Sequence, residues 1–499
     1  MTAKITFCGG AGTVTGANFL LDTHSASSGQ AGAKLLIDCG TLEAADSVTA
    51  LGFSNAGVPA KKISAQEHGC DTVNSAPFPY DVKEIDALLV THAHQDHIGR
   101  IPRLVRDGFS GAIHSTAATK DLAAVMFDDA LGVMKEHAEK FGCEMLYDAA
   151  DVEMALSLWN GHEYHKSFQL NDVSAEFLDA GHILGSAMIR LTRLNRSNGA
   201  VGRTDSLCES VLGGKSIIFS GDIGNTPEPL LRDCESPAGA DYLVMESVYG
   251  DRVHEGRSER KEALRTAVEE VRNRGGVLLI PSFSIERTQI LLFELNDMVE
   301  DGSMQAIPVY LDAPLASRVT QVFRKYSGLF NPAVREHFSR GDDPFSFKGL
   351  TVVRSTEESR AIHRKPDPKV IIAGAGMSGG GRVRAHEKYY LGDKRTTLLF
   401  VGYQASGTLG RRLQEGEKRV VIDKEHVKVR AQVSALTGYS GHADRDQLLR
   451  FIENAGVPKK VFITMGEPRA SLFLAQRARD FLGVDAVVPQ RGESFDIEW

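Results

Sequence analysis

A cluster of titratable side chains directly after an apolar run constrains the fold of this chain more than any other feature. Residues 87–90 are all apolar and predict a short buried strand, and His92, His94, Asp96 and His97 follow within a few positions. Burying so many polar groups costs several kcal/mol unless something pairs with them. Imidazole and carboxylate groups are the usual ligands of zinc and manganese. Because the spacing H-x-H-x-D-H is specific for metal sites, we favour a metal centre over a solvated, histidine-rich loop.

The size and composition of the chain narrow the class of protein. Its 499 residues are 42% hydrophobic, which is enough for two or three domains with their own cores. The sequence contains no run of about eighteen apolar residues, so we expect no membrane span. The first residues lead directly into a strand-like pattern and lack the basic start and apolar core of a signal peptide. The six cysteines are scattered and form no C-x-x-C pair, which predicts reduced thiols and a cytoplasmic location.

The formal net charge of −8 bears on the choice of partner. A negative total charge counts against a nucleic-acid-binding protein, because the phosphate backbone is itself negative. It does not exclude one, since binding depends on a local basic surface and the carboxylates of a metal site add to the negative sum. Nucleic acid therefore stays open as a partner.

The pattern of apolar residues divides the chain into two kinds of structure. The first part alternates strands with glycine turns, and its predicted strands are residues 4–8, 17–21, 34–38, 187–194 and 215–220. From about residue 256 strands alternate with helices. The predicted strands there are residues 277–280, 307–311, 369–373 and 397–401, and the predicted helices are one capped by Ser258 and ended by Gly275 and one over residues 287–300. This alternation indicates a parallel sheet with helices on both faces.

Some polar segments have no clear period. Residues 24–33 are rich in serine, glycine and alanine and predict a hairpin loop, and residues 45–75 predict a surface insertion near the histidine motif. We favour plain loop variation over a functional lid for both. A further polar stretch separates the strands at 187–194 and 215–220, which together predict a long hairpin.

Two further groups of polar residues follow predicted strands. The segment 179–186 contains Asp179 and His182 beside glycines, and the segment 220–224 contains Asp222 beside glycines. Glycine allows the backbone to approach a ligand closely. Each segment alone is more typical of a structural turn, but together with the histidine motif they supply enough ligands for two metal ions.

These motifs resemble those of the metallo-β-lactamase superfamily, in which H-x-H-x-D-H is followed by a distant histidine and a distant aspartate. The resemblance implies six metal ligands: His92, His94 and His182 in a first site, Asp96 and His97 in a second, and Asp222 between the two ions. Two ions about 4 Å apart can share a hydroxide that is already deprotonated near neutral pH. That hydroxide would attack an electrophilic carbon or phosphorus.

The rest of the chain resembles one branch of this superfamily, the β-CASP nucleases, which insert a second domain into the lactamase fold. The resemblance rests on five blocks in order, at residues 246–254, 281–289, 379–383, 402–410 and 438–444. It implies an α/β fold: a metallo-β-lactamase αββα sandwich with an inserted β-CASP domain, whose parallel sheet is flanked by helices. The implied divisions are 1–245 and 421–499 for the lactamase domain and 246–420 for the β-CASP domain. An ordinary α/β core with glycine turns is the alternative.

The β-CASP resemblance also implies catalytic roles. His442 would give a proton to the leaving oxygen as a general acid, oriented by a hydrogen bond to Glu246. Asp96 would take part in catalysis as a ligand of the second metal.

The same resemblance implies a substrate-binding turn. Gly380, Gly381 and Arg382 would bind the phosphate backbone of the substrate. A plain tight turn explains the glycine run about as well. Arg411 and Arg412 would add phosphate contacts, and a solvated helix face explains them equally well.

One position departs from the RNA-acting members of the branch. Their His-Gly-Glu block supplies a histidine to the second metal site, whereas this chain has Met465 at that position, followed by Gly466 and Glu467. A thioether is a soft ligand that replaces imidazole poorly on zinc, so we expect the second site to be weaker. Met465 slightly favours DNA as substrate, because DNA-acting members tend to have an apolar residue there. Glu246 and the block at 402–410 resemble the RNA-processing members.

The leading hypothesis is a metal-dependent ribonuclease that hydrolyses phosphodiester bonds of single-stranded RNA in RNA processing or decay. Its cofactor would be Zn²⁺ in two sites, with Mn²⁺ as the alternative. Its partner would be single-stranded RNA and not a membrane, and a homodimer is one of the oligomeric states left open. Three alternatives are a DNA-acting β-CASP nuclease, a hydrolase of small esters, and a catalytically weakened RNA-binding protein, which Met465 suggests. The middle domain argues against the small-ester hydrolase, because small substrates need no such cover.

Overall fold

The computed structural model describes residues 2–24, 32–42, 71, 73–194, 214–405 and 407–499. The chain folds into two compact units: the first comprises Met1–Pro227, Asp233–Val253 and His442–Trp499, and the second comprises Glu228–Arg232 and His254–Gly441. The domain boundaries at residues 246 and 420 come from sequence blocks, and they stay predictions. The predicted insertion at 45–75 and the polar loops at 24–33 and 195–214 lie wholly or mainly outside the described residues.

Two sheets form the first unit. One has the strand order β22–β1–β2–β3–β4–β5–β6 and the other the order β21–β20–β11–β10–β9–β8–β7. The strands of the first sheet are β1 (Thr2–Gly9), β2 (Asn18–Asp22), β3 (Lys34–Ile37), β4 (Ala87–Leu89), β5 (Ala112–Thr116), β6 (Trp159–His162) and β22 (Ser494–Glu498). Those of the second sheet are β7 (Phe168–Leu170), β8 (Val173–Asp179), β9 (Ala187–Arg193), β10 (Ser216–Phe219), β11 (Tyr242–Met245), β20 (Lys460–Ile463) and β21 (Ala486–Val487). The first and last strands of the chain pair antiparallel.

Successive side chains of a strand point to opposite faces of its sheet, so each sheet has an inner and an outer face. The two sheets pack with their inner faces together. In β10, Ile217 and Phe219 lie in the core between the sheets, together with Phe7 of β1. Ile218, between them in sequence, belongs to the core on the outer face of the second sheet. The alternation within one short strand therefore serves two cores.

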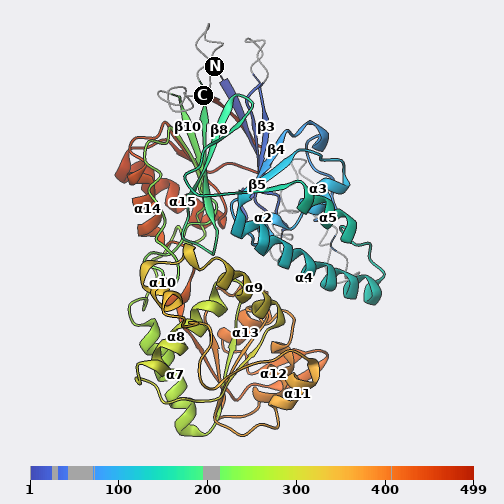
Figure 1. The fold of residues 1–499 in the computed structure, drawn as a ribbon, viewed down its shortest axis with the longest axis vertical. Helices are drawn as coiled ribbons and strands as arrows, with labels where there is room; N and C mark the ends of the chain where they lie inside the picture. Colours follow the sequence, from blue (N-terminus) through green and yellow to red (C-terminus); the bar gives the residue numbers. More distant parts are fainter. Residues whose placement is uncertain (1, 25–31, 43–70, 72, 195–213, 406) are drawn as a thin grey trace. The chain divides into compact units, whose positions relative to one another are not determined.

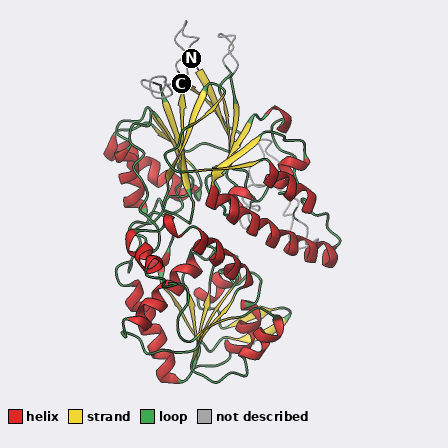
Figure 2. Cartoon of the chain, viewed as in Figure 1, coloured by secondary structure: helices red, strands yellow, loops and turns green. Residues whose placement is uncertain are grey.

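Helices cover the outer face of each sheet, as Figures 1 and 2 show. α14 (Arg445–Asn454) and α15 (Pro468–Arg477) pack on the second sheet. On the first sheet, α4 (Ala117–Phe141) contacts β5 and β6, and α3 (Ile101–Arg106) packs against α5 (Ala149–Ser157). The first unit is an αββα sandwich, as the sequence predicted.

A parallel sheet forms the centre of the second unit. Its strand order is β14–β13–β15–β12–β16–β19, and neighbouring strands run parallel. The strands are β12 (Val277–Pro281), β13 (Val309–Asp312), β14 (Leu350–Val352), β15 (Lys369–Ala373), β16 (Thr397–Phe400) and β19 (Gln432–Ala435). A separate hairpin is formed by β17 (Arg419–Ile422) and β18 (Glu425–Lys428).

Helices flank this sheet on both sides (Figure 1). They are α7 (Arg260–Arg274), α8 (Arg287–Glu300), α9 (Pro314–Lys325), α10 (Pro332–Ser339), α11 (Thr356–Ile362), α12 (Val383–Tyr390) and α13 (Leu409–Gln414). Side chains of α12, such as Val383 and Tyr390, share a core with Val277 and Leu279 of β12. The predicted α/β class, a lactamase sandwich with an inserted parallel-sheet domain, is confirmed.

The first helix of the second unit begins one residue later than the predicted cap requires. Ser258 does not cap α7, because its hydroxyl donates to Glu259 Oε1 and the helix starts at Arg260. The helix ends at Gly275 as predicted, with φ +61°, a conformation that costs glycine little. α8 has the predicted bounds.

The state of the cysteines and the length of the helices test two predictions from the sequence, reduced thiols and the absence of a membrane span. Cys8, Cys39 and Cys234 are free thiols, but Cys143 is disulfide-bonded. The expectation of reduced thiols is therefore wrong for Cys143, because spacing along the chain does not determine which thiols fold close together. Among the described residues, no helix is both long and apolar enough to cross a membrane.

Candidate metal centre

The predicted metal ligands all lie in the first unit, near the ends of strands from both of its sheets. They are His92 and His94 after β4, Asp96 and His97 on the short helix α2 (Gln95–Ile98), His182 after β8, and Asp222 after β10. β8 and β10 both pair antiparallel with β9, so they run in the same direction and end at the same edge. The structure thus brings together side chains that are far apart in sequence.

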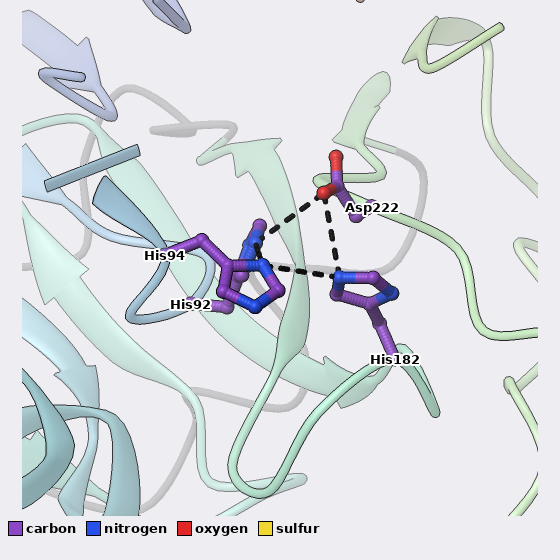
Figure 3. Close-up of side chains that lie close together, drawn as sticks. All are labelled: His92, His94, His182 and Asp222. Atoms are coloured by element: carbon purple, nitrogen blue, oxygen red, sulfur yellow. Dashed lines mark hydrogen bonds and ion pairs between the residues drawn. The ribbon is translucent and has the colours of Figure 1, made fainter. Parts of the chain in front are cut away.

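Four of these side chains point toward one another in a compact cluster (Figure 3). His94 Nδ1 lies 3.1 Å from His92 Nε2 and 3.3 Å from His182 Nε2. Asp222 Oδ2 lies 3.4 Å from the Nε2 atoms of both His92 and His182. Around a zinc ion with bonds of about 2.0–2.1 Å, tetrahedral ligand atoms are about 3.4 Å apart. The spacing of the three imidazoles and the carboxylate therefore fits one tetrahedral ion.

The remaining two ligands approach the other oxygen of the same aspartate. His97 Nε2 lies 3.3 Å from Asp222 Oδ1 and 3.8 Å from Asp96 Oδ2. His97 Nε2 and Asp222 Oδ1 are buried, and neither forms a hydrogen bond with a described residue. Buried polar atoms without a partner are costly, so their convergence fits a bound cation. Two carboxylates and one imidazole suit zinc or manganese.

The charges of the four-residue cluster match those of metal ligands. Burial lowers the pKa of His92, and it lowers the pKa of His94 and of His182 well below the ordinary value. These imidazoles are therefore neutral at pH 7, as coordination requires. Burial alone would raise the pKa of Asp222, but the imidazoles of His97 and His92 hold it well below its ordinary value.

Asp38 fixes the orientation of His97. Its Oδ2 atom lies 2.7 Å from His97 Nδ1 and accepts a hydrogen bond from the Thr91 hydroxyl, while Oδ1 accepts the Thr91 amide. An imidazole that donates from Nδ1 to a carboxylate presents Nε2 to a metal. Burial opposes protonation, but Asp222, Asp38 and Asp96 raise the pKa of His97 well above its ordinary value. These carboxylates thus require a positive charge among them, which a metal ion would supply.

A histidine–glutamate pair lies beside the four-residue cluster. His442 Nδ1 lies 3.2 Å from both oxygens of Glu246 and 3.9 Å from Asp222 Oδ2. Glu246 is buried and accepts the amide of Ile223 at 2.5 Å, so its carboxylate is held in place. The ring centroids of His442 and His182 are 4.7 Å apart. The predicted pair is therefore within reach of a group bound at the metal ligands.

Hydroxyl groups fix the loop that carries His182. Thr116 Oγ1 and Thr119 Oγ1 each donate to the carbonyl oxygen of Gly185, at 2.7 and 2.8 Å, and both threonines are buried. Ser186 Oγ accepts the amide of His182 at 3.0 Å. Gly185 has φ +79°, and a Cβ atom there would lie 2.7 Å from a side chain of α4. The first turn of α4 therefore sets the position of this ligand.

Met465 lies near the second group of ligands, but it packs in the core between the sheets. Its amide donates to the carbonyl oxygen of Gly10 at 2.6 Å, and a Cβ atom on Gly10 would lie 2.5 Å from Met465 Sδ. A small pocket is lined by Met465 together with His97 and Glu246. The thioether is a packing group, so this position adds no nitrogen or oxygen ligand.

The predicted substrate residues lie in the second unit, between β15 and α12. A Cβ atom on Gly379 or Gly380 would meet nothing within 4 Å, so the turn is open. The Arg382 guanidinium donates from Nη1 to Asp312 and from Nη2 to the carbonyl oxygen of Arg354. The turn is therefore accessible, whereas Arg382 is bonded to the protein.

Sequence reasoning missed several of these contacts. Asp38 directly follows β3, which pairs parallel with β4 beside the histidine motif. In the sequence, the only sign of its role was that it is a polar residue at the end of a predicted strand. Thr116 and Thr119 carried none, because Gly185 is far from them in sequence. Arg411 and Arg412, which had two interpretations, pair with exposed or half-buried glutamates of their own segment, as expected of a solvated helix face.

Three domain families match successive parts of the chain. The metallo-beta-lactamase superfamily matches residues 29–127, and the Beta-Casp domain matches residues 288–413. The Zn-dependent metallo-hydrolase RNA specificity domain matches residues 426–489. The order of these matches is that of a lactamase fold interrupted by an inserted domain.

Known proteins are similar to the chain over most of its length. The ribonuclease TTHA0252 of Thermus thermophilus is 37% identical over 424 residues, which are 85% of this chain and 89% of the relative. The transcription termination factor FttA of Methanocaldococcus jannaschii is 32% identical over 431 residues, 84% of this chain and 64% of the relative. The crystal structure of a protein of unknown function from Enterococcus faecalis covers 100% of both chains with a TM-score of 0.52 and 13% identity, which supports the fold alone.

An αββα sandwich with a histidine-rich ligand cluster at the ends of its strands defines the metallo-hydrolase class of lactamase fold. Family matches and a relative that is 37% identical over most of both chains narrow that class. The chain belongs to the β-CASP branch of the metallo-β-lactamase superfamily.

Proposed function

We propose that this protein is a metal-dependent ribonuclease that hydrolyses phosphodiester bonds of single-stranded RNA. The observation that carries the proposal is the four-residue cluster of His92, His94, His182 and Asp222 with the His442–Glu246 pair beside it. In such an arrangement a metal ion that polarises the phosphate would lie next to a proton donor. Hydrolysis of an unactivated phosphodiester needs both. The similarity to a protein named a ribonuclease supports RNA as the substrate, as does the match to an RNA specificity domain.

Zinc is the metal that these ligands favour, with manganese as the alternative. The first ion would be held by three neutral imidazoles and one carboxylate, those of His92, His94, His182 and Asp222. Asp96, His97 and Asp222 would hold a second ion. Because Met465 adds no ligand there, the second site is the weaker one. When bound, the metal lowers the pKa of a water molecule and neutralises negative charge on the phosphate.

The protein's own residues supply the proton transfer and its orientation. Hydrolysis forms a bond from phosphorus to the oxygen of a water molecule and breaks the bond from phosphorus to the leaving ribose oxygen. His442 gives that leaving oxygen a proton. Glu246 accepts from His442 Nδ1 and so fixes the ring and its tautomer. Asp38 does the same for His97 through its own Nδ1 contact. Gly380 and Gly381, with Arg382 beside them, bind the phosphate backbone of the strand.

End-labelled single-stranded RNA, incubated with zinc or manganese, tests the proposal. We expect a product ladder that is lost in Asp96→Ala and kept in Asp496→Ala, which changes an exposed aspartate on β22. The ladder also separates internal from terminal attack. Cleavage of DNA alone or of a small ester alone would replace the proposal by one of those activities. RNA binding without cleavage would make the chain a binding protein, with Met465 as the first cause to examine.

A further inference from the structure

Asp312 lies at the carboxyl end of β13, in the parallel sheet of the second unit. From β13 the chain continues to β14 on one side, whereas from the neighbouring strand β15 it continues to β16 on the other side. In open parallel sheets, ligands bind outside the carboxyl ends of the strands where connections diverge in this way. The turn of Gly379–Gly381 follows β15 at the same edge. Asp312 therefore occupies a place where this kind of sheet binds ligands.

Asp312 is fully buried and accepts hydrogen bonds from three side chains. The Ser359 hydroxyl donates to Oδ2 at 2.5 Å, and His386 Nε2 lies 2.8 Å from the same oxygen. Arg382 Nη1 donates to Oδ1. Burial alone would raise the pKa of Asp312, but these bonds hold it below its ordinary value. The carboxylate is therefore ionised, and His386 is in turn 3.1 Å from His363 Nε2.

Stability alone does not account for this arrangement. Taking a carboxylate and a guanidinium out of water costs at least as much as their attraction returns in many proteins, and apolar packing of the same volume serves as well. Directional hydrogen bonds add a defined geometry instead. Asp312 connects β13 to α11 through Ser359 and to the start of α12 through Arg382 and His386. What it determines is therefore the position of the segment before α12.

That segment is the glycine turn, which is open at its tip and fixed at its base. Within the described residues, neither Gly379 nor Gly380 donates its amide to a hydrogen-bond acceptor. Gly381 has φ +69°, and a Cβ atom there would lie 2.6 Å from the carbonyl oxygen of Gly374. α12 begins directly afterwards at Val383, and the positive end of its dipole favours an anion. The turn thus offers amides to a phosphate, and its base permits only glycine.

We propose that Asp312 is a positioning residue for the RNA substrate: by fixing Arg382 it holds the glycine turn so that the exposed amides bind a phosphate other than the one that is hydrolysed. The inference rests on the proposed ribonuclease function and deepens it. Arg382 acts in this scheme as the link between Asp312 and the turn. Because amides and a helix end contact phosphate and not bases, the turn binds the RNA backbone without sequence preference.

Asp312→Asn tests the inference, because it keeps the volume of the side chain and removes the charge. The variant and the wild type are compared on single-stranded RNA and on bis(p-nitrophenyl) phosphate, which has one phosphate and none to place on the turn. We expect KM for RNA to rise about tenfold, the effect of one lost charge-assisted hydrogen bond, with little change in kcat. The ratio of the two kcat/KM values, RNA over small diester, then falls about tenfold. The control is Asp343→Asn, which breaks a surface pair with Arg324 in the same unit and leaves the ratio at the wild-type value.

An unchanged ratio in folded Asp312→Asn, or an equal loss on both substrates, overturns the inference. If this variant does not fold, Gly380→Val decides, since the structure has room for the added side chain and the side chain would cover the amides. A wild-type ratio in Gly380→Val likewise overturns the inference. Wild-type protein that cleaves no RNA with either metal would contradict the proposed function itself, and that outcome is visible before any variant is compared.

Discussion

His442 Nδ1 lies at the same distance, 3.2 Å, from both carboxylate oxygens of Glu246. Because this nitrogen faces the carboxylate, the proton on Nδ1 is held there, and Nε2 is the nitrogen left for proton transfer to a substrate. Glu246 therefore acts through His442, and its importance depends on how much the leaving group needs a proton.

Glu246→Gln should separate these two effects. An amide orients His442 less well, so we expect kcat for RNA to fall by up to about 10²–10⁴, the range that general acid catalysis contributes. A p-nitrophenyl phosphodiester needs little protonation of its leaving group, so its hydrolysis should fall by less. Steady-state rates on both substrates measure the difference, with Glu269→Gln on α7 as a control at a surface pair. An equal loss on both substrates would mean that Glu246 supports the metal ligands and not the proton donor.

Thr119→Val should weaken the first metal site without touching a ligand. The hydroxyl that bonds the Gly185 carbonyl is lost, and the loop of His182 gains freedom. Loss of a group that orients a ligand typically weakens metal affinity about tenfold or more. Competition with a chelating dye measures zinc affinity directly, and Thr119→Ser, which keeps the hydroxyl, should retain wild-type affinity. If valine and serine variants bind zinc equally well, the hydroxyl does not position the loop.

Met465→His should raise the metal content of the protein. Among the described residues, the second group of ligands consists of Asp96, His97 and Asp222. An imidazole at position 465 would add a better zinc ligand than a thioether. We expect the second ion to bind about tenfold more tightly or better, measured by isothermal titration and by elemental analysis after dialysis. Met465→Leu, which keeps an apolar side chain in the core, serves as the control. An unchanged second affinity would show that position 465 does not reach the ion.

Glu387 should make the second unit less stable at neutral pH than at acidic pH. Its side chain is buried, Ser378 donates to Oε1, and Oε2 has no hydrogen-bond partner among the described residues. Burial raises its pKa from 4.5 to about 7. Between these values the folded state keeps a proton that the unfolded chain releases, so the free energy of unfolding falls as the pH rises through this window, by about 1–3 kcal/mol.

The Glu387→Gln variant checks that dependence. Glutamine resembles the protonated carboxyl, so the variant should match the wild type at pH 5 and be more stable at pH 8. Urea unfolding of both proteins at the two pH values measures the difference. A stability difference that is the same at pH 5 and pH 8 would assign the effect to packing and not to ionisation.

The local pattern of apolar residues was enough to predict the helices and strands in which that pattern is regular. β15 and α8 have the predicted bounds, because a buried central strand and a long amphipathic helix each carry their period within a short segment. α4, a helix of 25 residues in the first unit, was not predicted. Ser258 was misassigned by one position, because several polar residues near the start of α7 are equally able to cap a helix.

The sequence by itself determined the kind of chemistry: three imidazoles and a carboxylate in one short motif, more ligands after later strands, and the family that arranges them in this way. Only the tertiary structure decided that Asp38 orients His97, that Thr119 supports the loop of His182, and that Arg382 is bonded to Asp312. These contacts join segments far apart in the chain. They form only when particular strands pair and when folding buries the side chains away from water. The apolar pattern of a short segment does not determine either condition.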